Sequence, residues 1–265
     1  GMDSLPFRIV IFGTMFFDLV MLCVLMNRLA GSRVAGFASA LLFAANSSLA
    51  IPLSWASAYN QVMISGFLLV ATYLFVRYTE SGNRKYYWWQ WLVFLLGFGV
   101  LEVNVVYPAI AAVYAFCFAR KYFKSTLPMF LASIAFTVAH RAAAGPQRTT
   151  IYQLFFDFSI FQTLWTYLRW AVGGTRIALA VGEPASPFRA GEIIAGAALL
   201  FTIVCMIRKR QWIVLFFVGW FLGVLAPVLP LRNHITEYYL VAPCVGLAML
   251  GDFTFWEKLD LLAGA

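Results

Sequence analysis

The chain has 265 residues, of which 63% are hydrophobic, 18% aromatic and only 11% Asp, Glu, Lys or Arg, and its mean hydropathy is +0.83. A soluble globular domain carries about a quarter charged residues, so this composition excludes a soluble fold and makes the lipid bilayer the solvent. The apolar runs continue for roughly 15 to 20 residues without alternating polar positions, which excludes a membrane β-barrel and predicts helical spans. We assign the net charge of +8 to cytoplasmic loops and expect no nucleic-acid partner.

The apolar segments predict an all-α polytopic membrane protein of about nine transmembrane helices, in a single domain that covers residues 1–265. Several of these segments are shorter than the ~20 residues that a perpendicular span needs, which indicates tilted helices. The predicted spans are 9–26, 34–53, 62–76, 88–101, 103–119, 126–140, 191–207, 211–230 and 239–250.

The loop charges predict the orientation, because short cytoplasmic loops retain Lys and Arg. Alternate loops are basic, whereas 53–60 carries no charge. The basic loops contain Arg28 and Arg33, then Arg77, Arg84 and Lys85, then Arg120, Lys121 and Lys124, and finally Arg208, Lys209 and Arg210. We therefore expect an integral protein of a bacterial inner membrane with residue 1 outside, preceded in the parent protein by at least one helix and one outer segment.

Residues 141–190 allow two interpretations. The segment 155–170 mixes aromatic rings with Asp157 and Arg169, which is typical of an interfacial or re-entrant helix at the outer headgroup level. The alternative is a tenth span at 164–181, which would place Arg169 at membrane depth. We prefer the interfacial helix, because another crossing would move the last basic loop to the outside.

Candidate functional residues are few and lie at the predicted outer ends of helices. Glu102 interrupts an apolar stretch, where an ionisable group is costly unless it faces a cavity, a partner or water; functional and structural roles are equally compatible with it. Nearby, Asn104 and Pro108 predict a broken helix. In the polar segment 232–239, Arg232, His234 and the tyrosines suit capture of a lipid phosphate, and the alternative is an ordinary polar turn.

Three segments together resemble the C-type membrane glycosyltransferases (GT-C fold), especially the O-mannosyltransferase branch with tetratricopeptide repeats. In 41–67, Trp55 and Ser57 match the family's Trp-x-Ser turn. In 100–108, Glu102 and Pro108 match its Ser-Lys-Glu stretch and the following proline. In 238–248, the residues that match its closing signature are Tyr239, Pro243, Val245, Gly246 and Leu247.

The chain also departs from the family at most of its polar positions. Apolar or neutral residues replace a His-Pro pair, a His and a Glu, the Arg and Asp after the Trp turn, and the Ser and Lys before the glutamate. A glutamate replaces the Arg of the closing signature. The replacing residues are Asn46, Ser47, Leu49, Ile51, Tyr59, Gln61, Val100, Leu101 and Glu237. The family's catalytic acid belongs to an outer loop upstream of this sequence.

The resemblance implies a GT-C-like enzyme that moves a sugar from a polyprenyl-phosphate donor to an acceptor on the outer face, by inverting displacement with a carboxylate base. Glu102 is then the best available polar contributor to catalysis, and we expect the base itself to be absent from this sequence. Arg232, His234 and Tyr239 bind the lipid phosphate. No cofactor is evident, and a divalent metal is expected only if the upstream acid exists. The alternative is a catalytically degenerate scaffold whose partners are membrane lipid and other membrane subunits.

Overall fold

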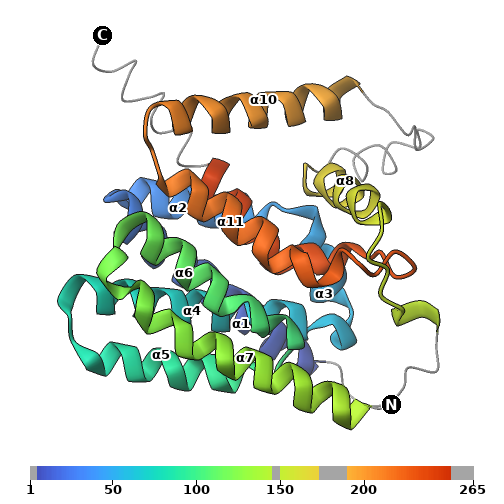
Figure 1. The fold of residues 1–265 in the computed structure, drawn as a ribbon. Coiled ribbons are helices and arrows are strands. Elements are labelled where there is room, and N and C mark those ends of the chain that lie inside the picture. The colour runs from blue at the N-terminus through green and yellow to red at the C-terminus, as the bar shows by residue number, and fades with distance from the viewer. Residues whose placement is uncertain (1–4, 145–149, 173–189, 252–265) are drawn as a thin grey trace.

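A computed structural model describes residues 5–144, 150–172 and 190–251, and all regular secondary structure in these residues is helical (Figure 1). The elements include both α-helices and short 3-10 turns (η). In chain order they are α1 (Leu5–Ala30), α2 (Arg33–Ala44), η1 (Ser47–Leu49), α3 (Ala50–Ser54), η2 (Ala56–Ala58), α4 (Asn60–Ser81), α5 (Arg84–Gly97), η3 (Glu102–Val106), α6 (Tyr107–Phe118), η4 (Arg120–Tyr122), α7 (Phe123–Ala144), η5 (Thr150–Tyr152), α8 (Ser159–Ala171), α10 (Ala190–Arg208), α11 (Ile213–Leu225), η6 (Ala226–Val228) and η7 (Glu237–Leu240). The chain continues from η7 as a C-terminal helix to Gly251.

Three helical segments of the described chain are long and apolar enough to cross a membrane: Leu5–Ala30, Ala56–Ser81 and Arg120–Ala143. A bent pair, Arg33–Ala44 with Ser47–Ser54, would add a fourth. The remaining apolar helices have 10–17 residues. The all-helical membrane class is thus compatible with the structure, whereas the number of nine spans stays a prediction.

The predicted continuous span at 34–53 is wrong in one respect, because the chain bends by 54° between α2 and the segment formed by η1 and α3. The Asn46 side chain accepts a hydrogen bond from the Ser48 amide at 2.9 Å and so caps a new helical turn in the middle of the apolar stretch.

The broken helix predicted near Glu102 is confirmed. After α5 the chain makes the 3-10 turn η3, and Pro108 lies in the first turn of α6.

Large side chains fill the centre of the bundle, where α6 and α11 pack together. Trp220, Tyr107 and Phe216 are completely buried there. The outer surface is apolar as well: Phe16 on α1, Leu131 on α7 and Phe201 on the peripheral helix α10 each expose about 70% of their surface. Such outward-facing apolar side chains are compatible with lipid as the surrounding solvent.

The basic connections between helices lie together at one end of the bundle, away from the uncharged connection 53–60. The α1–α2, α4–α5, α6–α7 and α10–α11 connections all lie at the left in Figure 1, and we call this the basic end. At the opposite end lie α3, α8 and the N-terminal end of α1. This separation agrees with the alternation predicted from loop charge, and the orientation of the basic end toward the cytoplasm stays a prediction.

Candidate functional site

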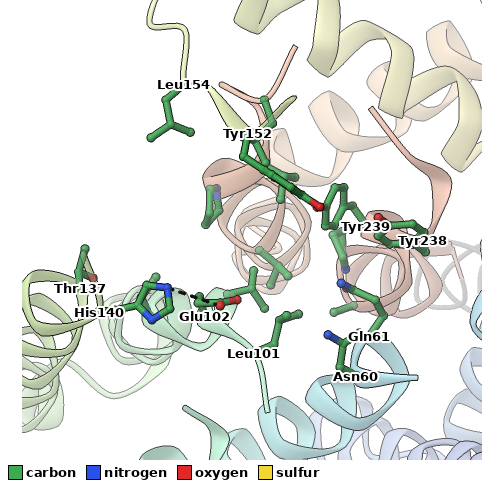
Figure 2. Close-up of a pocket in the computed structure, with 18 of the residues that line it drawn as sticks. Asn60, Gln61, Leu101, Glu102, Thr137, His140, Tyr152, Leu154, Tyr238 and Tyr239 are labelled. Atoms are coloured by element: carbon green, nitrogen blue, oxygen red, sulfur yellow. Dashed lines mark ion pairs between the residues drawn. The ribbon is translucent and has the colours of Figure 1, made fainter. Parts of the chain in front are cut away.

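A cavity of about 1510 Å³ lies at the end of the bundle opposite the basic end. Figure 2 shows that helix ends and turns from distant parts of the sequence form its walls. Its lining residues come from the η2 region and the start of α4 (Trp55, Ser57, Ala58, Asn60, Gln61), the η3 region before α6 (Leu101, Glu102, Val103, Val105), the C-terminal part of α7 (Phe136, Thr137, His140, Arg141), the end of η5 and the segment after it (Tyr152, Gln153, Leu154, Phe156), the end of α11 with η6 and the following turn (Val224, Pro227, Val228, Leu231), and η7 with the C-terminal helix (Tyr238, Tyr239, Ala242, Pro243).

Glu102 and His140 face each other in this cavity (Figure 2). The Glu102 Oε1 atom lies 3.7 Å from His140 Nε2, and the two side chains are 59% and 49% exposed. A hydrogen bond would need a shorter distance. The two groups form an ion pair only when the imidazole is protonated. The carboxylate and the imidazole therefore remain accessible to a molecule in the cavity.

An aromatic stack holds the His140 ring. His140 stacks on Phe136, one helical turn earlier in α7, with ring centroids 5.6 Å apart, and Phe136 stacks in turn on Phe98 at 4.2 Å. Arg141 follows His140 and also lines the cavity. The last turns of α7 thus place an imidazole beside the Glu102 carboxylate and add a guanidinium to the lining of the cavity.

The local structure around Glu102 explains its position. The α5 helix ends at Gly97, and the Nδ2 group of the buried Asn104 donates to the Phe94 carbonyl oxygen at 2.6 Å, which satisfies a carbonyl at the end of that helix. A Cβ at residue 97 would lie 2.8 Å from the Asn104 amide group, so only glycine permits this close approach. The turn is thereby fixed, and Glu102 begins the 3-10 turn η3 at the cavity wall.

Of the three residues predicted to bind a lipid phosphate, Tyr239 lines the cavity, whereas Arg232 and His234 are not among the lining residues. Arg232 Nη1 lies 3.3 Å from Asp157 Oδ2, and its guanidinium lies over the Phe155 ring at 3.6 Å. His234 Nε2 is 3.1 Å from the Tyr238 hydroxyl. The structure therefore brings Tyr239 to the same cavity as Glu102, and it places Arg232 in another contact.

This contact fastens residues 151–158, which we call the strap, to the chain after α11. The Phe155 amide donates to the Pro230 carbonyl oxygen at 2.9 Å, next to the ion pair of Arg232 with Asp157. Hydrogen bonding by Ser159, whose amide donates to Asp157 at 2.8 Å, together with the Arg232 charge, holds the pKa of Asp157 below its usual range. Because the strap supplies part of the lining, Arg232 shapes the cavity indirectly.

The helix α8 that follows the strap is amphipathic, as the prediction of an interfacial helix requires. It buries Thr163 and Tyr167, and the Tyr167 hydroxyl lies 3.4 Å from the Thr236 amide nitrogen. It exposes Phe161 and Trp165. Its placement at a membrane surface stays a prediction, and the alternative tenth span at 164–181 falls partly outside the described residues.

The donor set that the described residues bring to the cavity does not by itself fit a divalent metal. Glu102 is the one carboxylate among the lining residues, and His140 is the one imidazole. In residues 5–144, 150–172 and 190–251, no group of three or more His, Cys, Asp and Glu side chains is arranged to hold a metal ion. We therefore derive no chemical step through a metal.

Comparisons with protein-family models, curated proteins and solved structures found no match to this chain. The resemblance to the C-type glycosyltransferases thus depends on the residues quoted above.

Sequence reasoning missed His140. It ends an apolar helix 38 residues after Glu102 and belongs to no motif, so the sequence offers only its position at the end of a predicted span. For Arg141, its position after that span predicts positive charge on the outer face that carries Arg232, and the alternative is a merely solvated loop residue.

Proposed function

We propose that the cavity binds a lipid-linked substrate, a polyprenyl-phosphate sugar, and that the chain serves glycosyl transfer as a GT-C-like protein. The proposal is supported by one observation in particular. The three segments that carry the resemblance, 41–67, 100–108 and 238–248, are far apart in the sequence, and each contributes matched residues to the same cavity: Trp55 and Ser57 from the first, Glu102 from the second, and Tyr239 and Pro243 from the third.

The size and composition of the cavity suit such a substrate. Pockets for drug-sized ligands have volumes of roughly 300–1,000 Å³. The volume of about 1510 Å³ leaves room for a sugar, a phosphate and the first isoprene units. Leu154, Phe156 and Val228 supply apolar walls, while Glu102 and Arg141 supply opposite charges. An amphipathic ligand needs both kinds of surface.

Each charged group has a role in this reaction. The acceptor hydroxyl attacks the anomeric carbon, the bond from that carbon to the phosphate oxygen breaks, and polyprenyl phosphate leaves with the electron pair. Glu102 takes the hydroxyl proton as general base. Arg141 and His140 donate hydrogen bonds to the phosphate that leaves, and these contacts strengthen as negative charge develops on the phosphate oxygens.

A second candidate function is a non-catalytic membrane scaffold that associates with other subunits. It is favoured by Leu101, which lines the cavity at the position of the family's Lys. An apolar residue at such a position removes a phosphate contact. The two candidates differ in whether the cavity still binds a charged lipid and whether Glu102 changes turnover.

Binding of polyprenyl phosphate to the purified chain tests the proposal. Arg141→Ala should weaken binding by on the order of 1.5–3 kcal/mol, as for loss of a hydrogen bond to a charged group. Arg33→Ala, which removes an exposed guanidinium at the basic end, is the matched control and should leave affinity unchanged. Arg232→Ala, which removes the contact of the strap with Asp157, should weaken binding less than Arg141→Ala. The reverse ranking would restore Arg232 as the phosphate ligand predicted from sequence. No detectable binding by the parent chain would exclude the lipid-phosphate cavity and leave the scaffold as the remaining candidate function.

Turnover provides the second test. With a polyprenyl-phosphate sugar as donor, Glu102→Gln should lower the transfer rate by about 10²–10⁴, the usual contribution of general-base catalysis. Glu80→Gln, at the basic end, is the control for a removed carboxylate and should leave the rate unchanged. Equal rates for the parent and Glu102→Gln would exclude Glu102 as the base.

A further inference from the structure

A cluster of cations occupies the basic end, far from the cavity. It comprises side chains from the end of α4, the start of α5 and the connection between α6 and α7. We define the basic cluster as Arg77, Arg84, Lys85, Arg120, Lys121 and Lys124. All of these except the half-buried Arg77 are exposed.

Aromatic contacts join the two connections into one surface. The rings of Tyr78 in α4 and Tyr122 in η4 lie 4.7 Å apart in an edge-to-face arrangement. The Tyr87 hydroxyl, at the start of α5, donates to the Ser125 carbonyl oxygen in α7 at 3.1 Å. Gly82, in the left-handed conformation with φ 68°, closes the turn after α4. The cations of both connections are therefore held on the same end of the bundle.

Two tyrosine hydroxyls hold the Arg77 guanidinium in place. Its Nη1 donates to the Tyr73 hydroxyl at 3.1 Å and its Nη2 to the Tyr86 hydroxyl at 2.8 Å. The guanidinium also lies 4.8 Å from the centroid of the Tyr86 ring. A guanidinium has five N–H donors, so two phenol contacts leave donors for an anion. Tyr rings beside a cation are typical of the membrane headgroup level.

The acidic side chains of α4 to α7 do not neutralise this cluster. Between residues 60 and 144 the chain has two acids, Glu80 and Glu102. Arg28 of α1 binds Glu80 through a hydrogen bond from Nε to Oε2 at 2.6 Å, and Glu102 lies in the cavity at the opposite end. The basic cluster thus presents a concentrated positive charge.

Large apolar side chains border the cluster on the outside of the bundle. Trp88 and Trp89 follow it on α5 and are 65% and 50% exposed, and Phe116 and Phe118 precede it on α6 with exposures of 58% and 46%. Arg120 lies over the Phe116 ring at 5.1 Å. A ligand that covers both surfaces carries a phosphate and an acyl chain on one molecule.

We propose that the basic cluster binds the headgroup phosphates of anionic phospholipids, with the acyl chains against the exposed tryptophans of α5. The chemistry that recognises the ligand is the combination of phosphate-binding cations and adjoining apolar rings. A soluble phosphate compound would use only the first, and a neutral lipid only the second. This site is independent of the cavity and of the glycosyl transfer proposed for it.

Brominated phospholipids test the proposal, because bromine quenches nearby tryptophan fluorescence. The purified chain in a zwitterionic detergent is titrated with brominated phosphatidylglycerol and separately with brominated phosphatidylcholine. Phosphatidylglycerol should quench at lower mole fraction. The triple variant Arg84→Gln, Lys85→Gln, Lys124→Gln should lose this preference, by about fivefold for each charge removed. Arg8→Gln removes an exposed cation from the N-terminal end of α1 and should retain it.

Two further arms separate the sources of phosphate. Added sodium chloride should weaken the preference for phosphatidylglycerol, since the contacts are exposed charges. Inorganic phosphate at the same ionic strength should weaken it no further. Equal quenching by the two lipids in the parent, or a preference that survives in the triple variant, overturns the proposal. Specific displacement by inorganic phosphate would assign the site to a soluble anion and likewise overturn it.

Discussion

Gly246→Ala should destabilise the fold, because the C-terminal helix packs directly on the backbone of α11. A Cβ at residue 246 would lie 2.6 Å from the Phe217 carbonyl oxygen, 2.9 Å from the Phe221 amide nitrogen and 3.0 Å from the Trp220 ring. Two of these neighbours are helix backbone atoms, which cannot turn aside as a flexible side chain does. The same contact includes a hydrogen bond of 2.9 Å from Trp220 Nε1 to the Ala242 carbonyl oxygen.

The magnitude follows from two opposing effects. Forcing an extra methyl group into a well-packed site costs about 1–3 kcal/mol. Replacing glycine by alanine inside a helix gains roughly 0.5–1 kcal/mol. The net expected loss of unfolding free energy is about 0–2.5 kcal/mol, and the two backbone contacts under 3.0 Å favour the upper half of this range. Gly223→Ala in α11 is the matched control, because a Cβ there meets nothing within 4 Å, and it should leave stability unchanged or raise it.

Unfolding of the detergent-solubilised chain by urea, followed through tryptophan fluorescence, measures both variants. Gly246→Ala should lower the midpoint and Gly223→Ala should not. Because Ala242 and Pro243 of the same helix line the cavity, Gly246→Ala should also weaken ligand binding there. Equal stability of the two variants would refute the inferred contact between helix backbones.

Three further outcomes are expected. Asn104→Ala should lower the unfolding free energy by about 1–3 kcal/mol, measured by the same urea titration, because a buried carbonyl at the end of α5 loses its donor. The hydrogen bonds from Ser159, and to a smaller extent the Arg232 charge, lower the pKa of Asp157, so these contacts stabilise the strap fully above the ordinary carboxyl pKa of about 4 and are lost as pH falls through the folded-state value. Hydrogen exchange of the strap should accelerate on acidification in the parent. In Arg232→Ala it should be faster at neutral pH and still accelerate on acidification, because the Ser159 hydrogen bonds remain. In a background without native cysteines, a membrane-impermeant thiol reagent applied to intact cells should label Ser57→Cys and spare Ser81→Cys, and the reverse pattern would invert the orientation.

Much of the helical organisation could be predicted, because long apolar runs and loop charges depend on composition alone. The segments 9–26, 62–76 and 126–140 fall within α1, α4 and α7, the helices of the three segments that are long and apolar enough to cross a membrane. The bend after α2 could not be predicted, since it depends on how the Asn46 side chain caps the next turn. An asparagine inside an apolar run can equally face a helix neighbour.

The candidate site could be predicted only in part. Glu102 could be predicted as a candidate, because an ionisable residue at membrane depth must face a cavity, a partner or water. In the structure it lines the cavity. Arg232 was predicted to bind a lipid phosphate because it lies in the densest polar segment of the sequence. In the structure it pairs with Asp157, 75 residues away in the sequence. The pairing of Glu102 with His140 depends on the packing of η3 against α7, which no local pattern in the sequence records.

Photo-crosslinking of a polyprenyl phosphate that carries a diazirine near its phosphate tests the central claim most directly. Mass spectrometry of the labelled chain should locate the adducts in 55–61, 101–105 and 238–243, and excess unlabelled polyprenyl phosphate should abolish them. Adducts confined to the outward-facing surfaces of α1 and α10, or adducts that excess ligand leaves unchanged, would contradict the account of the cavity as a lipid-phosphate site.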